Sequence, residues 1–235
     1  LAGLSLPTGA WLFGQGGWLN PAGYASLMLE EARATGRLRW QGGAHVRRLH
    51  RVAVDEQTKP AWQALGQDGQ VLASADSVVL ACAMDVNPLL HSIGASPLPL
   101  SDVRGQLSVL PEGWPGLQRP TRPIAGGGYA LSLGDGRVLC GATTQHHDTD
   151  PEVREADHLH NLRQAARLGV APHPESASLR GVWGRVGWRA TTPDRLPLVG
   201  AVPMPGFEAD AGGTRRMDQV RQVPRLRDDD GGVHV

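Results

Sequence analysis

The stretch with the clearest chemical potential lies late in the chain, where residues 187–200 read GWRATTPDRLPLVG. Arg189 follows a strand-like segment and precedes a Thr-Thr-Pro-Asp turn. A guanidinium held at the end of a strand presents two parallel N–H donors, which match the two oxygens of a carboxylate. Asp194 can orient the turn by accepting a bond from a nearby backbone N–H. The stretch therefore predicts a site that binds the carboxylate of a ligand. The alternative is that Arg185 and Arg189 share a strand face and pair with surface acids, contributing under about 1 kcal/mol.

Two further stretches could form the walls of such a site. In GGWLNP, Gly17 allows the backbone to approach a ligand closely and Trp18 could line a pocket. The alternative is a glycine turn with Trp18 in the core. In VRGQ, Arg104 and Gln106 lie on the same face of a strand and Gly105 leaves the opposite face open. The alternative there is an ordinary polar strand face.

The histidines and the basic residues favour no second chemistry. The pairs His146–His147 and His158–His160 lack the i, i+4 spacing that places two metal ligands on one helical face, so no metal site is expected. No GxSxG motif or Ser-His-Asp pattern stands out. The basic segment HVRRLHR, residues 45–51, could contact a polyanion, although a solvated strand edge is the simpler interpretation.

Composition excludes several classes of protein. The 235-residue chain carries 23 basic and 23 acidic residues, so bulk charge argues neither for nucleic acid nor for a membrane surface. No apolar run approaches the roughly 20 residues of a membrane span, and the first residues lack the basic start of a signal peptide. Cys82 and Cys140 lie in apolar runs and are expected to be buried free thiols in a reducing cytoplasm.

Helices that could position these residues are few. Pro21 opens a helical pattern with Asn20 as its N-cap, and Gly36 ends it. A second helix is expected from Pro151 to about Leu168, with Asp150 as its cap.

Strands and turns dominate the remainder. Asp-Gly and Gly-Asp-Gly turns predict two hairpins, and the apolar run 77–83 predicts a strand buried on both faces in a parallel sheet. Residues 196–202 predict a last strand, whereas 207–235 has no apolar period and is expected to be disordered. The two turns are residues 68–69 and 134–136. The run buried on both faces is 77–83, the last strand is 196–202 and the disordered segment is 207–235.

Together these stretches resemble the D-amino-acid oxidase-like flavoenzymes. The motifs GGWLNP, VVLACA, VRGQLS, GATTQHHDTD and GWRATTPDRLPLVG occur in the order of that family over about residues 7 to 204. The likeness is greatest to the branch that modifies the wobble uridine of tRNA, in which the oxidoreductase is fused to a methyltransferase domain.

The resemblance implies an α/β fold in which part of a Rossmann-like FAD-binding domain is combined with a mixed-sheet substrate domain. The implied boundaries are 1–20 for entry into the substrate domain, 21–90 for the FAD domain, 91–190 for the substrate domain, 191–206 for a return to the FAD domain and 207–235 for an atypical tail.

The resemblance also assigns roles to residues. Arg189 would bind the substrate carboxylate, aided by Arg104, Gln106 and Arg185. Gly17 and Trp18 would lie near the reactive face of the flavin. The cofactor contacts would be Val46, Ala81, Cys82, Ala83 and Asp194. The implied reaction removes the carboxymethyl group from carboxymethylaminomethyluridine in cytoplasmic tRNA and releases glyoxylate.

Two departures from the family pattern leave alternatives open. No GxGxxG follows a strand, and the glycine-rich helix that follows the last strand in the family is absent. These departures predict a truncated portion that holds FAD weakly and is inactive. The alternatives are an FAD-dependent oxidase or dehydrogenase of glycine or D-amino acids, and a non-catalytic remnant domain.

Overall fold

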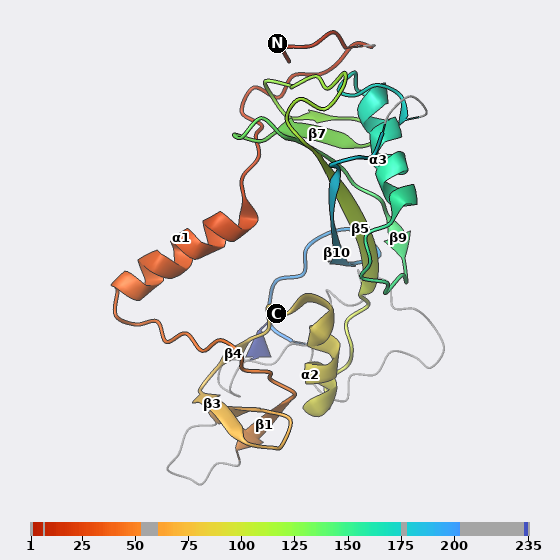
Figure 1. Ribbon diagram of the computed structural model, residues 1–235. Coiled ribbons are helices and arrows are strands. Elements are labelled where there is room, and N and C mark those ends of the chain that lie inside the picture. The colour runs from red at the N-terminus through yellow and green to blue at the C-terminus, as the bar shows by residue number, and fades with distance from the viewer. Residues whose placement is uncertain (1, 7, 53–60, 175–177, 203–232, 235) are drawn as a thin grey trace. The chain divides into compact units, whose positions relative to one another are not determined.

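The structure is a computed structural model, and the chain divides into two compact units (Figure 1). Unit 1 comprises Leu1–Arg39 and Val103–Trp188, and unit 2 comprises Trp40–Asp102 and Arg189–Val235. The described residues are 2–6, 8–52, 61–174, 178–202 and 233–234.

A sheet whose strands differ in length forms the centre of unit 1. Within the described residues it has the strand order β10-β5-β8-β7-β6, and β9 pairs with β5. The β7–β8 hairpin confirms the turn predicted at residues 134–136, because Ser132 pairs with Val138 and Gly136 has the positive φ of 87° that such a turn needs. The strands are β5 (Ser101–Leu110), β6 (Ile124–Ala125), β7 (Tyr129–Ser132), β8 (Val138–Gly141), β9 (Gln145–His146) and β10 (Trp183–Thr191).

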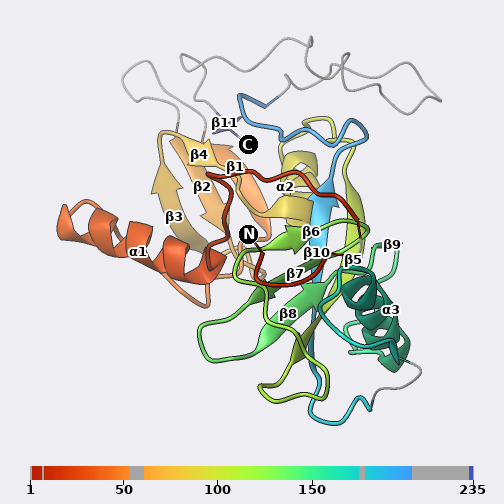
Figure 2. The ribbon, with the colours of Figure 1, turned by 90° about the horizontal axis from the view of Figure 1, so that it is seen from above.

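Helix α3 (Glu155–Arg167) packs against β7 and β8 of this sheet (Figures 1 and 2). Leu162 and Ala165 of the helix are fully buried against Val138 and Cys140 of β8. The predicted start at Pro151 is wrong by one turn. The carboxylate of Asp150 accepts bonds from the backbone N–H of Glu152 and from the guanidinium of Arg154, so it cannot cap the helix.

Helix α1 (Pro21–Ala34) of unit 1 confirms the predicted caps. The side chain of Asn20 accepts bonds from the backbone N–H groups of Ala22 and Gly23, and Gly36 has a φ of 71°. None of the residues of α1 is buried.

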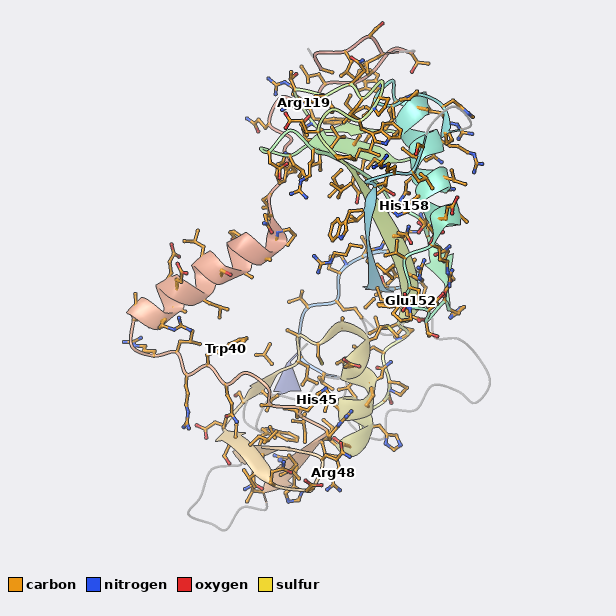
Figure 3. The ribbon with its side chains drawn as sticks, viewed as in Figure 1. Trp40, His45, Arg48, Arg119, Glu152 and His158 are labelled. Atoms are coloured by element: carbon orange, nitrogen blue, oxygen red, sulfur yellow. The ribbon has the colours of Figure 1, made fainter. Side chains whose placement is uncertain are left out.

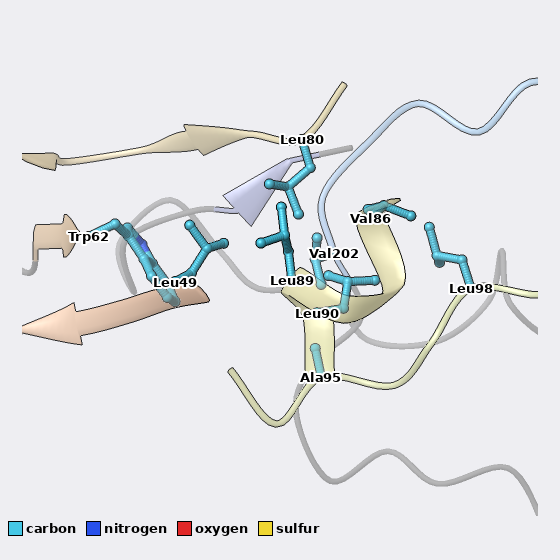
Figure 4. Packing of buried hydrophobic residues seen from close by; sticks show 9 residues of the cluster. All are labelled: Leu49, Trp62, Leu80, Val86, Leu89, Leu90, Ala95, Leu98 and Val202. Carbon is cyan, nitrogen blue, oxygen red and sulfur yellow. The ribbon is translucent and has the colours of Figure 1, made fainter. Parts of the chain in front are cut away.

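Unit 2 contains a three-stranded antiparallel sheet in the order β1-β2-β3. The predicted hairpin at residues 68–69 joins β2 to β3, with a φ of 78° at Gly69. Helix α2 packs on β1 and supplies Leu89 and Leu90 to the core (Figure 4). The elements are β1 (Arg48–Val52), β2 (Ala61–Leu65), β3 (Val71–Ala75), β4 (Val78–Val79), the 3-10 turn η1 (Ala83–Asp85), α2 (Val86–Ser92) and β11 (Val233–His234).

The apolar run 77–83 differs from its prediction. Only β4 is extended, and it pairs in parallel with β11. Leu80 is buried, but the side chain of Val79 is 71% exposed, so the run is not covered on both faces. Ala83, with a φ of 51°, turns the chain into η1 and ends the extended segment.

The last predicted strand, residues 196–202, is also wrong. Only Ala201 makes a strand-like bridge, and Val199 is 91% exposed, although Val202 is fully buried. Pro197 has no N–H to donate and Gly200 has a φ of 149°, so a regular ladder cannot form. The disorder predicted for 207–235 lies outside the described residues except at β11. Among the helices that the structure describes, none has the length and hydropathy needed for a bilayer span.

A buried arginine connects β5 to the segment that leads into α3. Arg104 is fully buried, and its Nη1 donates to Asp157 Oδ2 at 2.7 Å and to Gln145 Oε1 at 2.6 Å. Its Nε and Nη2 donate to the backbone carbonyls of Asp150 and Glu152. One guanidinium therefore holds four groups around the start of the helix.

Gln106 extends the same connection one strand step further. Its side-chain amide donates to the carbonyl of Arg154 and accepts from the N–H of Arg154, at 2.8 and 2.7 Å. The backbone N–H of Gln106 donates to Thr143 Oγ1. These bonds satisfy buried backbone groups at the first residue before the helix.

Ser108, His158 and Asn161 complete the contact between β5 and α3. Asn161 Nδ2 donates to Ser108 Oγ and to the carbonyl of Gln106, and Ser108 Oγ shares a hydrogen bond with His158 Nδ1 at 2.7 Å. Burial lowers the pKa of His158 below its ordinary value of 6.5, against the opposing charges of Asp157 and Glu155. Figure 3 shows His158 on α3.

We expect Arg104→Met to lower the free energy of unfolding by about 3–5 kcal/mol, because it leaves the Asp157 carboxylate buried without its cation. Urea denaturation measures the change. Arg163→Met, which removes an exposed arginine from the same helix, is the matched control. A loss for Arg104→Met no larger than for this control would contradict the structural role of Arg104.

We expect the free energy of unfolding to decrease as the pH falls below about 6.5, because His158 then takes up a proton on unfolding. Because its folded pKa is depressed, unfolding takes up a proton, so the stabilisation is complete above 6.5 and is lost as the pH falls through the folded value. In His158→Gln, the slope of unfolding free energy against pH between about 5 and 7 should be smaller than in the wild type. His160→Gln, at an exposed position of α3, is the control. An unchanged slope in His158→Gln would refute the assignment.

Candidate functional site

Arg189 lies near the end of β10 with an exposed side chain. Strand alternation places Arg185, Gly187 and Arg189 on one face of β10. A Cβ at Gly187 would meet nothing within 4 Å, so this face is open between the two arginines. Within the described parts of the chain, neither arginine side chain forms a hydrogen bond or an ion pair. Both guanidinium groups therefore retain donors for an anionic ligand.

The segment after Arg189 is fixed by its own hydrogen bonds. Asp194 Oδ1 accepts from the N–H of Leu196 at 3.0 Å, which confirms the predicted turn bond. Thr192 Oγ1 donates to the carbonyl of Leu196, and the N–H of Arg195 donates to the carbonyl of Thr192. Arg195 adopts a positive φ of 59°, a conformation that such a closed turn imposes. Arg189 is therefore followed by a turn with little freedom.

A further bond holds the strand end itself. Thr191 Oγ1 donates to the carbonyl of Ser101 at 3.0 Å, and both residues belong to unit 2. The backbone two residues after Arg189 is thus attached to the start of β5. An arginine supported in this way loses less conformational freedom when it binds a carboxylate.

Gly17 and Trp18 lie in unit 1, just before the cap of α1. A Cβ at Gly17 would have no neighbour within 4 Å, and the Trp18 side chain is 49% exposed. Trp18 is therefore not a core residue. The pocket role of both residues stays a prediction.

The residues expected at the cofactor lie in unit 2, and the structure brings two of them together. Val46 and Cys82 both pack against the same hydrophobic cluster, although they are far apart in sequence. Ala81 and Ala83 are exposed, and their small side chains leave the backbone accessible. Burial raises the pKa of the Cys82 thiol, so the group is a neutral packing residue at neutral pH.

Cys140, the second predicted free thiol, is fully buried in the core of unit 1. Burial raises the pKa of its thiol to about 12. It is therefore protonated and chemically inert at neutral pH.

Arg104 and Gln106 lie inside the contact between β5 and α3 and not beside the open face of β10. The partners described above are all protein groups, and both side chains are fully buried. Direct contact of either residue with a substrate stays a prediction, and the observed bonds favour a positioning role.

Sequence reasoning missed the residues on α3 that complete this contact. Asp157, His158 and Asn161 face the sheet. Arg104 of β5 bonds to Asp157, and Ser108 of β5 bonds to His158 and Asn161. A signal was present, because polar residues one and four positions apart in a helix occur opposite alternating polar positions of a strand. In the parts of the chain that are described, no three His, Cys, Asp or Glu side chains gather to hold a metal ion.

Comparison with known proteins identifies the family of the chain. The family described as FAD dependent oxidoreductase matches residues 2–216, which is most of the chain. A Methylibium petroleiphilum protein, tRNA 5-methylaminomethyl-2-thiouridine biosynthesis bifunctional protein MnmC, is 47% identical over 239 residues, covering 100% of this chain and 34% of the relative. The protein of the same name from Burkholderia pseudomallei strain 668 is 36% identical over 217 residues, covering 92% and 31%. The chain thus spans about a third of the length of these relatives.

Solved structures share the fold. Iminodiacetate oxidase from Chelativorans sp. BNC1 superposes with a TM-score of 0.55 at 24% identity, covering 77% of this chain and 45% of the oxidase. Glycine oxidase from Geobacillus kaustophilus gives a TM-score of 0.51 at 24% identity, covering 69% and 40%. The α/β fold of the D-amino-acid oxidase type that the sequence predicts is confirmed, and the structure adds that its sheets contain antiparallel pairs. The chain belongs to the FAD dependent oxidoreductase family and is similar in sequence to bifunctional tRNA-modifying members of it.

Proposed function

We propose that the chain carries the carboxylate-binding part of an FAD-dependent oxidoreductase that acts on carboxymethylaminomethyluridine at the wobble position of tRNA. The observation that carries the proposal is Arg189, an exposed arginine whose guanidinium retains hydrogen-bond donors. It lies near a strand end that is held by hydrogen bonds of Thr191 and Asp194. Support for the substrate class comes from the 47% identical relative, whose name states a role in tRNA 5-methylaminomethyl-2-thiouridine biosynthesis.

The proposed reaction converts the CH₂–NH group next to the carboxylate to CH=N, with loss of a hydride from the carbon and a proton from the nitrogen, which together are two electrons and two protons. Addition of one water then yields glyoxylate and a primary amine on the uridine. FAD, when bound, supplies the acceptor for the two electrons. The protein's part is to bind the substrate, orient the C–H bond and control water.

Arg189 would provide orientation through two charge-assisted bonds to the carboxylate, each contributing about 1.5–3 kcal/mol. Arg185, on the same strand face, would add positive potential. Cations near the substrate also lower the pKa of its amine. The amine would then arrive neutral, and no strong protein base would be required. The roles of Gly17 and Trp18 near the reactive face of the flavin are proposed from the family resemblance.

Cofactor contacts are proposed in unit 2. Val46 and the segment Ala81–Ala83 would contact the ADP half of FAD, and Asp194 would hold the turn beside it. Unit 1, built on the sheet with β5 and β10, would correspond to the substrate domain. The structure groups residues 21–39 with this unit, whereas the sequence interpretation placed residues 21–90 together.

Two wider proposals follow from the relatives. Their printed name calls them bifunctional, and we propose that a methyltransferase domain is the second part of such a protein. We also propose a cytoplasmic location, where the tRNA substrate occurs. Both are open to direct test on the protein isolated from its native cell.

The competing function is oxidation of free glycine or D-amino acids, favoured by the shared fold of a glycine oxidase. The experiment uses the full-length protein that contains this chain, loads it with FAD without oxygen, and follows the visible absorbance of the flavin. Addition of tRNA carrying the carboxymethylaminomethyl group should bleach it, whereas glycine and D-alanine should not. Bleaching by the amino acids alone would support the competing function. No bleaching by any of them would support a non-catalytic domain.

In the full-length enzyme, we expect Arg189→Lys to raise the KM for carboxymethylated substrate by roughly tenfold or more, because an ammonium cannot form two parallel bonds to a carboxylate. The affinity for FAD should change by less than about twofold. Steady-state kinetics and flavin fluorescence quenching measure the two quantities. Arg195→Lys, in the same turn region, is the control. Equal losses of substrate and FAD affinity in Arg189→Lys would show that Arg189 has a structural role.

A further inference from the structure

A basic segment that begins in unit 1 and continues into unit 2 is unused by the proposed chemistry. From residue 32 to residue 54 the sequence contains no Asp or Glu, although the chain as a whole balances its charges. The arginines and histidines of this segment are Arg33, Arg37, Arg39, His45, Arg47, Arg48, His50 and Arg51. Such a local excess of one sign attracts anionic partners.

The part of this segment in unit 2 lies on β1 and the residues that lead into it. We call it the β1 basic surface, and its exposed side chains are His45, Arg47, Arg48, His50 and Arg51. Strand alternation places Arg48 and His50 on one face of β1 and Arg51 on the other, so the basic side chains lie along both sides of this strand. Figure 3 shows His45 and Arg48 among the side chains of this unit. Leu49 between them is buried in the core, so the strand is anchored while its basic side chains remain in solvent.

Two arginines of this surface, Arg47 and Arg48, are not neutralised within the described residues. Arg104, Arg137 and Arg154 of unit 1 each pair with an aspartate. Arg47 and Arg48, by contrast, form no ion pair or side-chain hydrogen bond among the residues that are described.

Neighbouring elements supply little negative charge to this surface. Strands β2 and β3 and helix α2 contain no acidic residue. Asp68 lies in the β2–β3 turn, and the Arg48 guanidinium approaches that turn at Gly69. The surface therefore keeps a net positive charge.

An aromatic side chain lies close in sequence to these cations. Trp40 is the first residue of unit 2 and its side chain is 64% exposed. Exposed tryptophans beside arginines are the combination by which proteins hold RNA, because the arginines contact phosphates and the indole stacks on an unpaired base. An acidic protein would need the cations but not the exposed indole.

We propose that the β1 basic surface, with Trp40, binds the phosphate backbone and an unpaired base of the tRNA substrate. The inference rests on the proposed function, since it names the surface that holds the tRNA while its modified uridine is oxidised. It assigns tRNA contact to unit 2 and leaves carboxylate recognition to Arg189.

The test measures equilibrium binding of the whole chain to a fluorescently labelled, unmodified tRNA anticodon stem-loop at several salt concentrations. Arg47→Gln/Arg48→Gln should weaken binding by about tenfold or more at low salt and reduce the salt slope by about one to two. The matched control, Arg163→Gln/Arg167→Gln on α3, removes the same charge from exposed positions and should bind within about twofold of the wild type. Arg47→Lys/Arg48→Lys should retain most of the affinity.

Trp40→Ala tests the stacking contact. It should weaken binding to the stem-loop by about tenfold and leave binding to a fully paired RNA of equal length unchanged, because only the loop offers an unpaired base. Equal weakening with both RNAs would overturn the stacking role.

Three outcomes would overturn the proposal while leaving the oxidation chemistry open. The first is no tRNA binding by the wild-type chain, and the second is an equal loss of tRNA affinity in Arg47→Gln/Arg48→Gln and in the α3 control. The third is a parallel loss of FAD affinity in Arg47→Gln/Arg48→Gln, which would mean that the surface binds the cofactor. Conversely, loss of tRNA binding in this variant without flavin bleaching by carboxymethylated tRNA would support the surface and contradict the proposed function. Urea midpoints of all variants verify that they are folded.

Discussion

The buried guanidinium of Arg104 is the interaction on which unit 1 depends. It binds Asp157, Gln145 and two backbone carbonyls, and so fixes where the chain leaves the sheet and enters α3. A cation without exposure is tolerated only when its donors are paired. Because β5 carries Arg104 and also lies beside β10, the network that anchors the helix also stabilises the sheet that presents the arginines of β10.

The two kinds of arginine in this chain show how environment separates structural from functional cations. Arg104 is enclosed by oxygen atoms of the protein, and its positive charge is compensated there. Arg185 and Arg189 stand on an exposed strand face, and the turn after Arg189 is closed by Asp194 and Thr192. A carboxylate can therefore reach Arg189 without breaking an internal ion pair, whereas reaching Arg104 would require dismantling the start of α3.

Local patterns predicted the elements well where a single residue determines the outcome. Asn20, Gly36, Gly69 and Gly136 fixed caps and turns because each satisfies a backbone requirement that other residues meet poorly. Prediction failed where tertiary contacts compete with a local signal. Asp150 resembles an N-cap, but its carboxylate binds the Arg154 side chain. The order of the motifs along the chain predicted the family and the candidate site. The burial of Arg104 and Gln106 could not be predicted from the VRGQ motif alone.

The central claim is that Arg189 recognises a carboxylate in this site. It is tested most directly by the equilibrium affinity of the FAD-supplied chain for methoxyacetate and for its neutral isostere methoxyacetamide, in the wild type and in Arg189→Met. The account predicts that the wild type prefers the carboxylate by about tenfold or more and that Arg189→Met loses this preference. An equal preference in both proteins would contradict it.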